Sequence, residues 1–92
     1  MSSYRLFETE QFQKDLREIG RSGWSGIVEK LRKVVYPQLR EHPHFGPNIR
    51  KLRGYEPDTW RYRIGAWRFF HELDEDEHIV LLIAAKHRSV AY

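Results

Sequence analysis

Hydrophobic and polar residues alternate strictly along residues 60–64, where aromatic or aliphatic side chains are separated by Arg61 and Arg63. This pattern is typical of a β-strand with one face on a core and the other in water. Gly65-Ala66 interrupts the alternation, and a glycine followed by any residue suits a two-residue type II′ turn, which predicts a hairpin. The turn sets a register with Ile64 opposite Trp67, Tyr62 opposite Phe69 and Trp60 opposite His71 on one face, and Arg63 opposite Arg68 on the other.

The second face of this hairpin gathers Arg61, Arg63 and Arg68, and the turn contains no acid to neutralise them. Like charges placed opposite each other destabilise an antiparallel pair by about 0.5 kcal/mol, so the cluster favours a bound anion. Arginine presents a planar fork of donors that matches a phosphate group, which makes a phosphodiester the natural ligand. The solvated face of an ordinary antiparallel sheet explains the same alternation, and the hairpin alone leaves both interpretations open.

The N-terminal half predicts a strand followed by two helices. A short aromatic strand is expected at about residues 3–8, and Thr9 suits the N-cap of a helix that should end at Gly20. The apolar stripe of that helix is Phe12, Leu16 and Ile19, and the stripe of the second helix is Ile27, Val28, Leu31, Val34 and Val35. Pro37 should end or kink the second helix near Tyr36.

The C-terminal half predicts three strands. Residues 42–48 contain two prolines and a glycine and should form a loop, followed by a short extended piece at residues 49–53. Beyond the hairpin, residues 74–77 form an acidic connection, and the apolar segment 78–86 is expected to be a central strand. The predicted fold is a single α+β domain over residues 1–92 with the order β-α-α-β-β-β, in which a two-helix hairpin packs on one face of an antiparallel sheet.

Composition narrows the class of protein. The chain has 92 residues, 40% of them hydrophobic, and it lacks cysteine, which excludes disulfides and thiolate metal sites. Its longest apolar run, Ile79 to Ala85, is too short to span a membrane, and its N-terminus lacks the apolar segment of a secretory signal, so we expect a cytoplasmic protein without a membrane partner. Residues 50–68 carry six Lys or Arg and two acids, a basic patch suited to a nucleic acid or an acidic protein.

Candidate residues for metal binding and proton transfer are few. His42 and His44 lack a third ligand nearby, and residues 74–77 lack the glycine and the ligand spacing of a calcium loop, so we expect no metal and no other cofactor. The hairpin register directs His71 toward the core, where a structural role is expected. His87 follows the last strand and is better placed for catalysis.

Three segments of the chain resemble a known family. They are Lys51-Leu52-Arg53-Gly54, the run from Trp60 to Phe70 with Glu72, and the ending Lys86-His87-Arg88 to Tyr92. With the order of one strand, two helices and three strands, they are similar to the RelE/ParE superfamily of bacterial toxins from type II toxin–antitoxin systems, over nearly the whole chain. RelE-like members cut mRNA in the ribosomal A site without a metal ion, whereas ParE-like members inhibit DNA gyrase.

This resemblance implies roles for individual residues. The implied catalytic residues are Arg63, Arg68, Lys86, His87 and Tyr92. Arg68 matches the arginine that stabilises the transition state, Lys86 or His87 would assist proton transfer, and Tyr92 would orient a base by stacking. The implied RNA-binding residues are Lys51, Arg53, Arg61, Arg63, Phe70 and Arg88, of which Phe70 is suited to stack on a base.

The chain departs from the family pattern at three positions. RelE itself favours lysines in place of Arg61 and Arg63, and an arginine is a poor general base because it stays protonated. Several related nucleases carry a histidine where this chain has Ala91. The leading interpretation is a ribosome-dependent mRNA endoribonuclease whose partners are the ribosome, mRNA and a cognate antitoxin. The alternatives are a ParE-like gyrase inhibitor without nuclease chemistry and an inactive relative that only binds its antitoxin.

Overall fold

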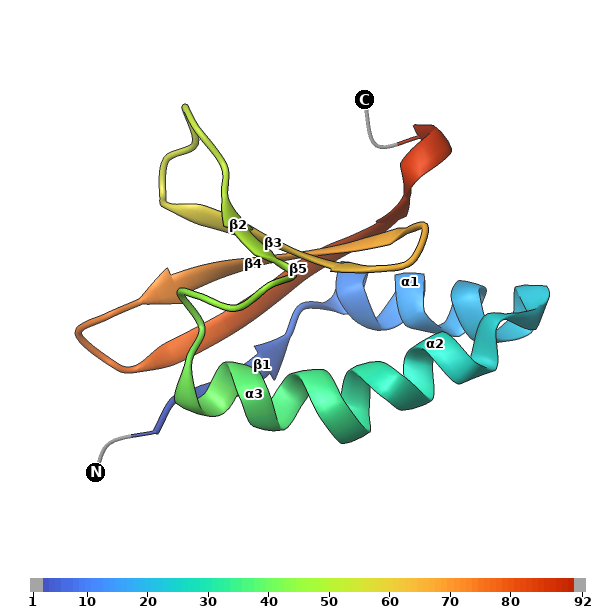
Figure 1. The fold of residues 1–92 in the computed structure, drawn as a ribbon, viewed down its shortest axis with the longest axis horizontal. Helices are drawn as coiled ribbons and strands as arrows, with labels where there is room; N and C mark the ends of the chain where they lie inside the picture. Colours follow the sequence, from blue (N-terminus) through green and yellow to red (C-terminus); the bar gives the residue numbers. More distant parts are fainter. Residues whose placement is uncertain (1–2, 91–92) are drawn as a thin grey trace.

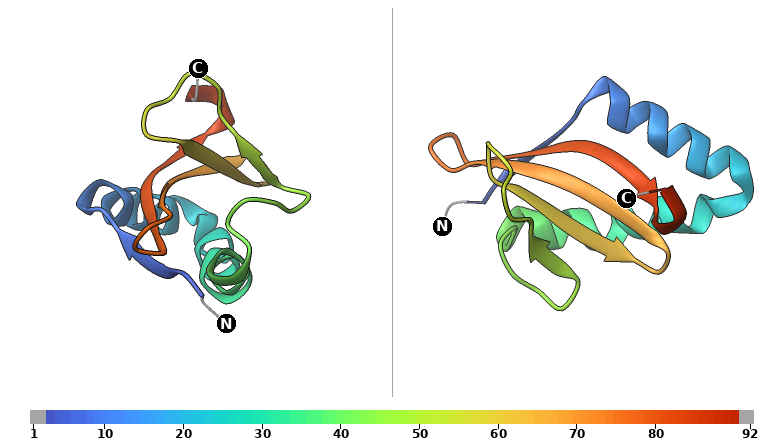
Figure 2. Two further views of the ribbon diagram at one scale, coloured as in Figure 1. Left: turned by 90° about the vertical axis from the view of Figure 1, so that its left-hand side faces the viewer. Right: turned by 90° about the horizontal axis from the view of Figure 1, so that it is seen from above.

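The computed structural model describes residues 3–90 and shows helices covering one face of a five-stranded sheet (Figure 1, Figure 2). The elements are β1 Arg5–Glu8, α1 Glu10–Ile19, η1 Gly20–Trp24, α2 Ser25–Lys30, η2 Leu31–Val35, α3 Tyr36–Glu41, β2 Ile49–Lys51, β3 Thr59–Ile64, β4 Trp67–Asp74, β5 Ile79–His87 and η3 Arg88–Val90. The strand order is β1-β5-β4-β3-β2. The predicted α+β class is confirmed. The sheet is mixed instead of antiparallel because β1 pairs in parallel with β5, and the chain between them supplies the long crossover that parallel pairing needs.

The first helix begins where the sequence predicts. The Thr9 hydroxyl accepts a hydrogen bond from the Phe12 amide at 3.1 Å, and the predicted apolar stripe is buried. The α-helix ends at Ile19 with Gly20 as its C-cap, as the sequence predicts, but Gly20 has helical dihedral angles and the helical path continues into η1. The helical path breaks at Gly23, whose φ of 92° lies in the left-handed region that glycine adopts readily. The turn η1 therefore joins α1 to α2.

Pro37 does not end the second helix. The Tyr36 amide bonds to the Leu31 carbonyl, five residues earlier, so the turn η2 is wider than an α-helical turn. A regular helix would bring the proline ring against the carbonyl four residues before it, and the wider turn makes room for that ring. Together α2, η2 and α3 form one long helix that ends at Glu41 (Figure 1).

The hairpin of β3 and β4 has the predicted register. The pairs Ile64–Trp67, Tyr62–Phe69, Trp60–His71 and Arg63–Arg68 all lie opposite each other. At the turn, φ is +57° at Gly65 and is not positive at Ala66, as a type II′ turn requires. Tyr62 and Phe69 face the helices and join the core, where the Phe69 ring meets the Phe12 ring edge to face at 6.2 Å between centroids.

The last strand, β5, lies between β1 and β4, which confirms the predicted central position. Its residues Val80 and Leu82 face the helices and are buried, whereas Leu81 and Ala84 on the other side are half-buried. The sheet thus has a covered face toward the helices and an open face away from them (Figure 2). Within residues 3–90, no helix has the length and apolar character needed to cross a membrane.

Candidate nucleic-acid interface

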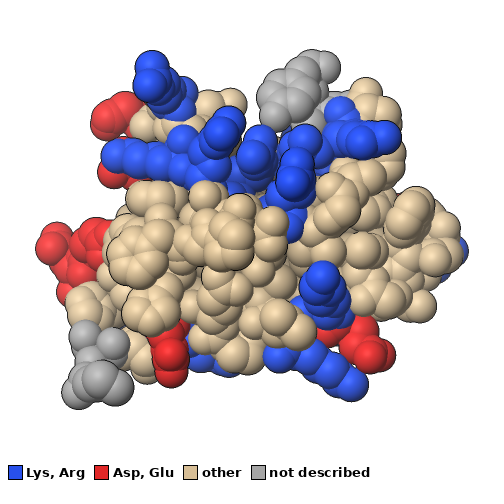
Figure 3. Space-filling view, viewed as in Figure 1, with Lys and Arg blue, Asp and Glu red and all other residues tan. Residues whose placement is uncertain are grey.

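Five neighbouring cationic side chains on β2 to β5 lie on the open face of the sheet and together form what we name the cationic face. They are Arg50 on β2, Arg61 and Arg63 on β3, Arg68 on β4 and Lys86 on β5. Arg63 is opposite Arg68, and Arg68 is opposite Lys86, so three cations form one row across adjacent strands. Arg50 and Arg61 are opposite each other and start a second row, which continues to an aromatic residue on β4. Figure 3 shows Lys and Arg side chains gathered in a band over these strands.

The charge of the cationic face is not neutralised by the described part of the chain. Among residues 3–90, none of its five members takes part in an ion pair. The Nε atoms of Arg61 and Arg68 and the Nη1 atom of Arg68 are buried and have no hydrogen-bond partner. A buried donor without a partner costs about 1–3 kcal/mol, so an anion that accepts hydrogen bonds from Arg68 would stabilise the protein.

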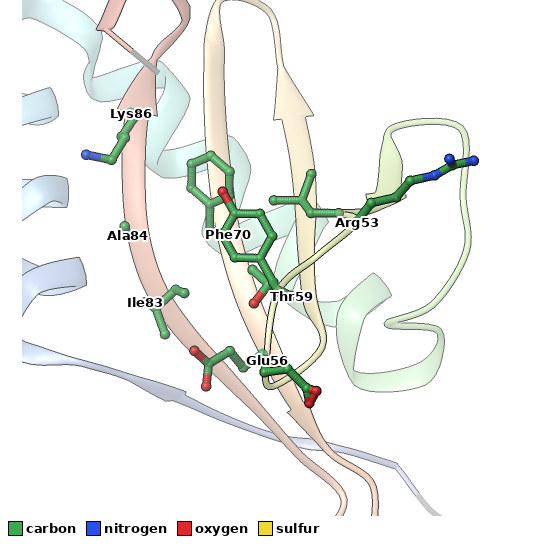
Figure 4. A pocket seen from close by; sticks show the side chains of 10 residues that line it. Arg53, Glu56, Thr59, Phe70, Ile83, Ala84 and Lys86 are labelled. Atoms are coloured by element: carbon green, nitrogen blue, oxygen red, sulfur yellow. The ribbon is translucent and has the colours of Figure 1, made fainter. Parts of the chain in front are cut away.

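A groove of about 430 Å³ lies beside the cationic face, between the β2–β3 loop and the strands β4 and β5. Its apolar lining includes Leu52, Tyr55 and Phe70, and its charged lining includes Glu56, Glu72 and Lys86. Figure 4 shows Phe70 in the middle of the groove, with Lys86 toward one end and Glu56 toward the other. The Thr59 hydroxyl donates to the Pro57 carbonyl at 3.0 Å, which helps to fix the loop. The groove has the size of a small-molecule site and combines an aromatic ring with both signs of charge.

The structure brings five of the predicted site residues together. Arg61, Arg63 and Arg68 lie on the cationic face, and Phe70 and Lys86 also line the groove. Two more predicted residues lie at the margin. Arg53 lines the groove, but Figure 4 shows its side chain directed away from β5. Lys51 is paired with Asp58 at 3.3 Å between Nζ and Oδ2.

Three predicted residues do not join this cluster. His87 is opposite Trp67 on the side of the sheet that faces the helices, with 5.1 Å between the ring centroids. Its Nδ1 atom accepts from the Ser89 amide at 3.3 Å and lies 2.9 Å from the Ser89 hydroxyl. Arg88 is exposed in η3, and Tyr92 lies outside the described residues. On the described strands, Lys86 is therefore the predicted proton-transfer group on the open face.

His71 lies on the covered side of the sheet, as the hairpin register predicts. Its side chain is fully buried, and Nε2 donates to the Pro43 carbonyl at 3.2 Å. Burial lowers the pKa of His71 to about 4, because the charged imidazolium is poorly solvated there. At neutral pH the ring is uncharged and separated from the groove, so the role of His71 is structural.

Comparison with known proteins now identifies the family. Residues 6–92 match the family model described as the ParE toxin of the type II toxin–antitoxin system parDE. The chain belongs to the RelE/ParE superfamily of toxins. Among curated protein sequences, none matches this toxin.

Solved structures share the fold of this toxin. The archaeal RelE–RelB complex from Pyrococcus horikoshii OT3 matches with a TM-score of 0.69 and 22% identity, covering 99% of this chain and 100% of that one. A metal-bound toxin from Helicobacter pylori matches with a TM-score of 0.76 and 20% identity over 100% of both chains. The DinJ–YafQ toxin–antitoxin complex from E. coli matches with a TM-score of 0.76 and 12% identity over 97% of each chain.

Three residues of this toxin have a place in the site that sequence analysis did not give them. Arg50 completes the second cationic row, but it lies in a strand of three residues, too short for a periodic signal. Glu56 lies in the loop and Glu72 on β4, and only the folded chain brings both carboxylates to one groove. Side chains alternate along a strand, and Phe69 and His71 both point to the covered face. The same alternation could have placed Glu72, the next residue, on the open face.

Proposed function

We propose that this toxin is an endoribonuclease that cleaves mRNA on the ribosome without using a metal ion and thereby inhibits translation. The observation that supports this is the row of Arg63, Arg68 and Lys86, in which two nitrogens of Arg68 are buried without a partner. Such a row suits a scissile phosphodiester. It also suits the negative charge that grows on the phosphate oxygens in the transition state, because fixed donors are most effective where charge develops.

In this proposal, four members of the cationic face have a defined task. Arg61 and Arg63 hold the RNA backbone, and Arg68 stabilises the pentavalent phosphate. Phe70 lies opposite Arg61, so a base stacked on its ring would leave the neighbouring phosphate near a guanidinium. Lys86 faces both the row and the groove and assists proton transfer there, whereas His87 faces the helices. Tyr92 orients a base.

The partners in this proposal are the ribosome, mRNA and a cognate antitoxin, and the location is the cytoplasm. Two structures that share the fold contain an antitoxin, RelB in one and DinJ in the other. An acidic segment of the antitoxin would complement the unpaired cationic face and would compete with RNA for Arg68.

Replacement of Arg68 tests the nuclease proposal. We expect Arg68→Ala to relieve growth arrest and to slow cleavage of ribosome-bound mRNA by about 10²-fold or more, as loss of one transition-state donor does in other enzymes. Arg68→Lys should give an intermediate rate, because it keeps the charge and loses the fork. The measurement is primer extension of RNA ends with purified ribosomes.

Arg17→Ala is the matched control, since Arg17 is an exposed arginine on α1, away from the sheet. It should leave toxicity and cleavage unchanged. Circular dichroism confirms that each variant is folded. Full toxicity of a folded Arg68→Ala variant would contradict the role of this residue.

Inhibition of DNA gyrase is a second candidate function, because the matching family model describes ParE toxins. RNA ends and plasmid supercoiling measured in the same expressing cells separate the candidates. Cleaved mRNA with unchanged supercoiling supports the nuclease, and altered supercoiling with intact mRNA supports the gyrase inhibitor. No response in either assay identifies an inactive relative that only binds its antitoxin.

A further inference from the structure

A second groove lies at the other end of the open face, and its chemistry is opposite to that of the cationic face. This acidic groove has a volume of about 780 Å³. Its lining includes the apolar residues Phe7, Ile79 and Leu81 and the acidic residues Glu72, Asp74 and Asp76. Among the described residues that line it, none is Lys or Arg. Figure 3 shows Asp and Glu side chains gathered at the left-hand end of the molecule, where Figure 1 places the β4–β5 turn.

The apolar part of the acidic groove is accessible. Phe7 lies on the edge strand β1 and is 46% exposed, and it is opposite the half-buried Leu81. The Arg5 guanidinium, on the same strand, lies 5.7 Å from the centroid of the Phe7 ring. An exposed aromatic ring beside half-buried aliphatic residues is the kind of surface that a protein partner buries.

Two carboxylates in the acidic groove are available to a ligand. Glu75 also lines the groove, but its carboxylate accepts a hydrogen bond from the Tyr4 hydroxyl at 2.5 Å and is bonded to His44. Asp74 accepts from the Glu77 amide at 3.0 Å. By contrast, the side chains of Glu72 and Asp76 have no hydrogen bond or ion pair within residues 3–90. They can accept from a Lys or Arg of a partner.

We propose that the acidic groove docks a segment of the antitoxin that carries apolar side chains together with Lys or Arg; this inference rests on the proposed function. The apolar side chains of the segment cover Phe7 and Leu81, and its cations pair with Glu72 and Asp76. Charge complementarity selects this occupant, because RNA or an acidic segment would meet like charge here.

The position of Glu72 connects the two ends of the open face. Its side chain lines both the acidic groove and the groove beside Lys86. A segment anchored on Phe7 and Asp76 can therefore continue along Glu72 toward the groove beside Lys86. The antitoxin can then exclude RNA while gaining affinity from residues that the proposed nuclease reaction does not use.

Substitutions of two exposed residues test the docking surface. We expect Phe7→Ala and Asp76→Lys each to weaken antitoxin binding by about tenfold, the effect of losing one anchor of an interface. Growth arrest in the absence of antitoxin should be unchanged, because neither residue belongs to the cationic face. The measurement is calorimetric titration of the antitoxin into each purified toxin variant.

Two matched control variants make the same kinds of substitution outside the acidic groove. Glu77→Lys makes the same charge change in the same turn but outside the groove lining, and Val34→Ala truncates an apolar residue that is 51% exposed on η2. Both should bind the antitoxin within about twofold of the parent. Unchanged affinity of Phe7→Ala and Asp76→Lys would overturn the proposal, as would loss of toxicity with normal antitoxin binding.

A photocrosslink tests the chemistry of the segment. With Phe7→p-benzoylphenylalanine in the toxin–antitoxin complex, irradiation followed by mass spectrometry should identify an antitoxin peptide that contains apolar residues and Lys or Arg. An acidic peptide, or no crosslink in a complex that forms normally, would overturn the proposal. Persisting toxicity of Arg68→Ala would instead remove the nuclease function and leave these binding results standing.

Discussion

At the scale of single residues, Arg68 has a cation on each side, Arg63 on β3 and Lys86 on β5. The sequence predicts the first neighbour, because a two-residue turn sets the register of the hairpin. It does not predict the second. Strict alternation from the buried Val80 and Leu82 would place Lys86 on the covered face, but the strand pairing shifts by one residue between Phe70 and His71. That irregularity, which has no local sequence signal, moves Lys86 to the open face.

His71 should make the stability of the toxin depend on pH. Its pKa is about 4 in the folded protein and near 6.5 in the unfolded chain, so the unfolded chain binds protons preferentially between these values. The free energy of unfolding should therefore fall as the pH drops from about 6.5 to about 4, by up to roughly 3 kcal/mol. Urea unfolding at a series of pH values measures this decline.

His71→Gln is the control variant, because its amide can still donate to the Pro43 carbonyl and does not titrate. Its stability should be nearly independent of pH in this window. Glu75 should cause a separate decline in the free energy of unfolding. Its pKa is lowered chiefly by the hydrogen bond from Tyr4 and then by the bond to His44. That contribution is present above pH 4.5 and is lost as the pH falls further, in both proteins. An unchanged slope in His71→Gln would show that another group titrates.

At the scale of elements, local signals predict the structure well and long-range pairing does not follow from them. The start of α1 at Thr9 and the hairpin turn at Gly65 each depend on a few neighbouring residues. The parallel pairing of β1 with β5 and the addition of β2 to the sheet join distant segments, and only the complete core selects them. The wide turn η2 likewise accommodates Pro37, where the sequence predicts only that the helix ends or kinks.

Thr9 links α1 to the centre of the sheet, and its loss should be measurable. Its hydroxyl accepts from the Phe12 amide at 3.1 Å and donates to the Ile83 carbonyl at 3.2 Å. We expect Thr9→Ala to lower the free energy of unfolding by about 1 kcal/mol, the usual effect of removing an N-cap. Thr9→Ser keeps the hydroxyl and should lose less. Equal stabilities of these two variants in urea unfolding would indicate that the cap contributes nothing.

At the scale of the whole molecule, the open face is divided by sign, with cations over β2 to the end of β5 and carboxylates at the β4–β5 turn. The net charge of +3 does not show that the opposite charges lie at separate ends of this face. In the proposed nuclease, such a face would orient an RNA strand as well as attract it, because one end repels phosphate. Composition revealed the basic patch, but the acidic groove required the fold, since Phe7 and Asp76 are distant in sequence.

RNA binding by the purified toxin should weaken steeply with salt. Each phosphate neutralised on a single strand contributes about −0.7 to the slope of log K against log salt, so contacts from Arg61, Arg63 and Arg68 give a slope of about −2. Arg63→Ala should make the slope shallower by about 0.7, and Arg17→Ala should not change it. Fluorescence anisotropy of a short labelled RNA at several salt concentrations measures both. Equal slopes for Arg63→Ala and the parent would remove Arg63 from the interface.

The pairing of β1 with β5 also governs when the toxin becomes complete during its own synthesis. β1 begins at Arg5 and β5 ends at His87, so the sheet can be completed only after residue 87 has been synthesised. Lys86, the third cation of the row, emerges with this last strand. A nascent chain therefore lacks both the centre of its sheet and part of its cationic face.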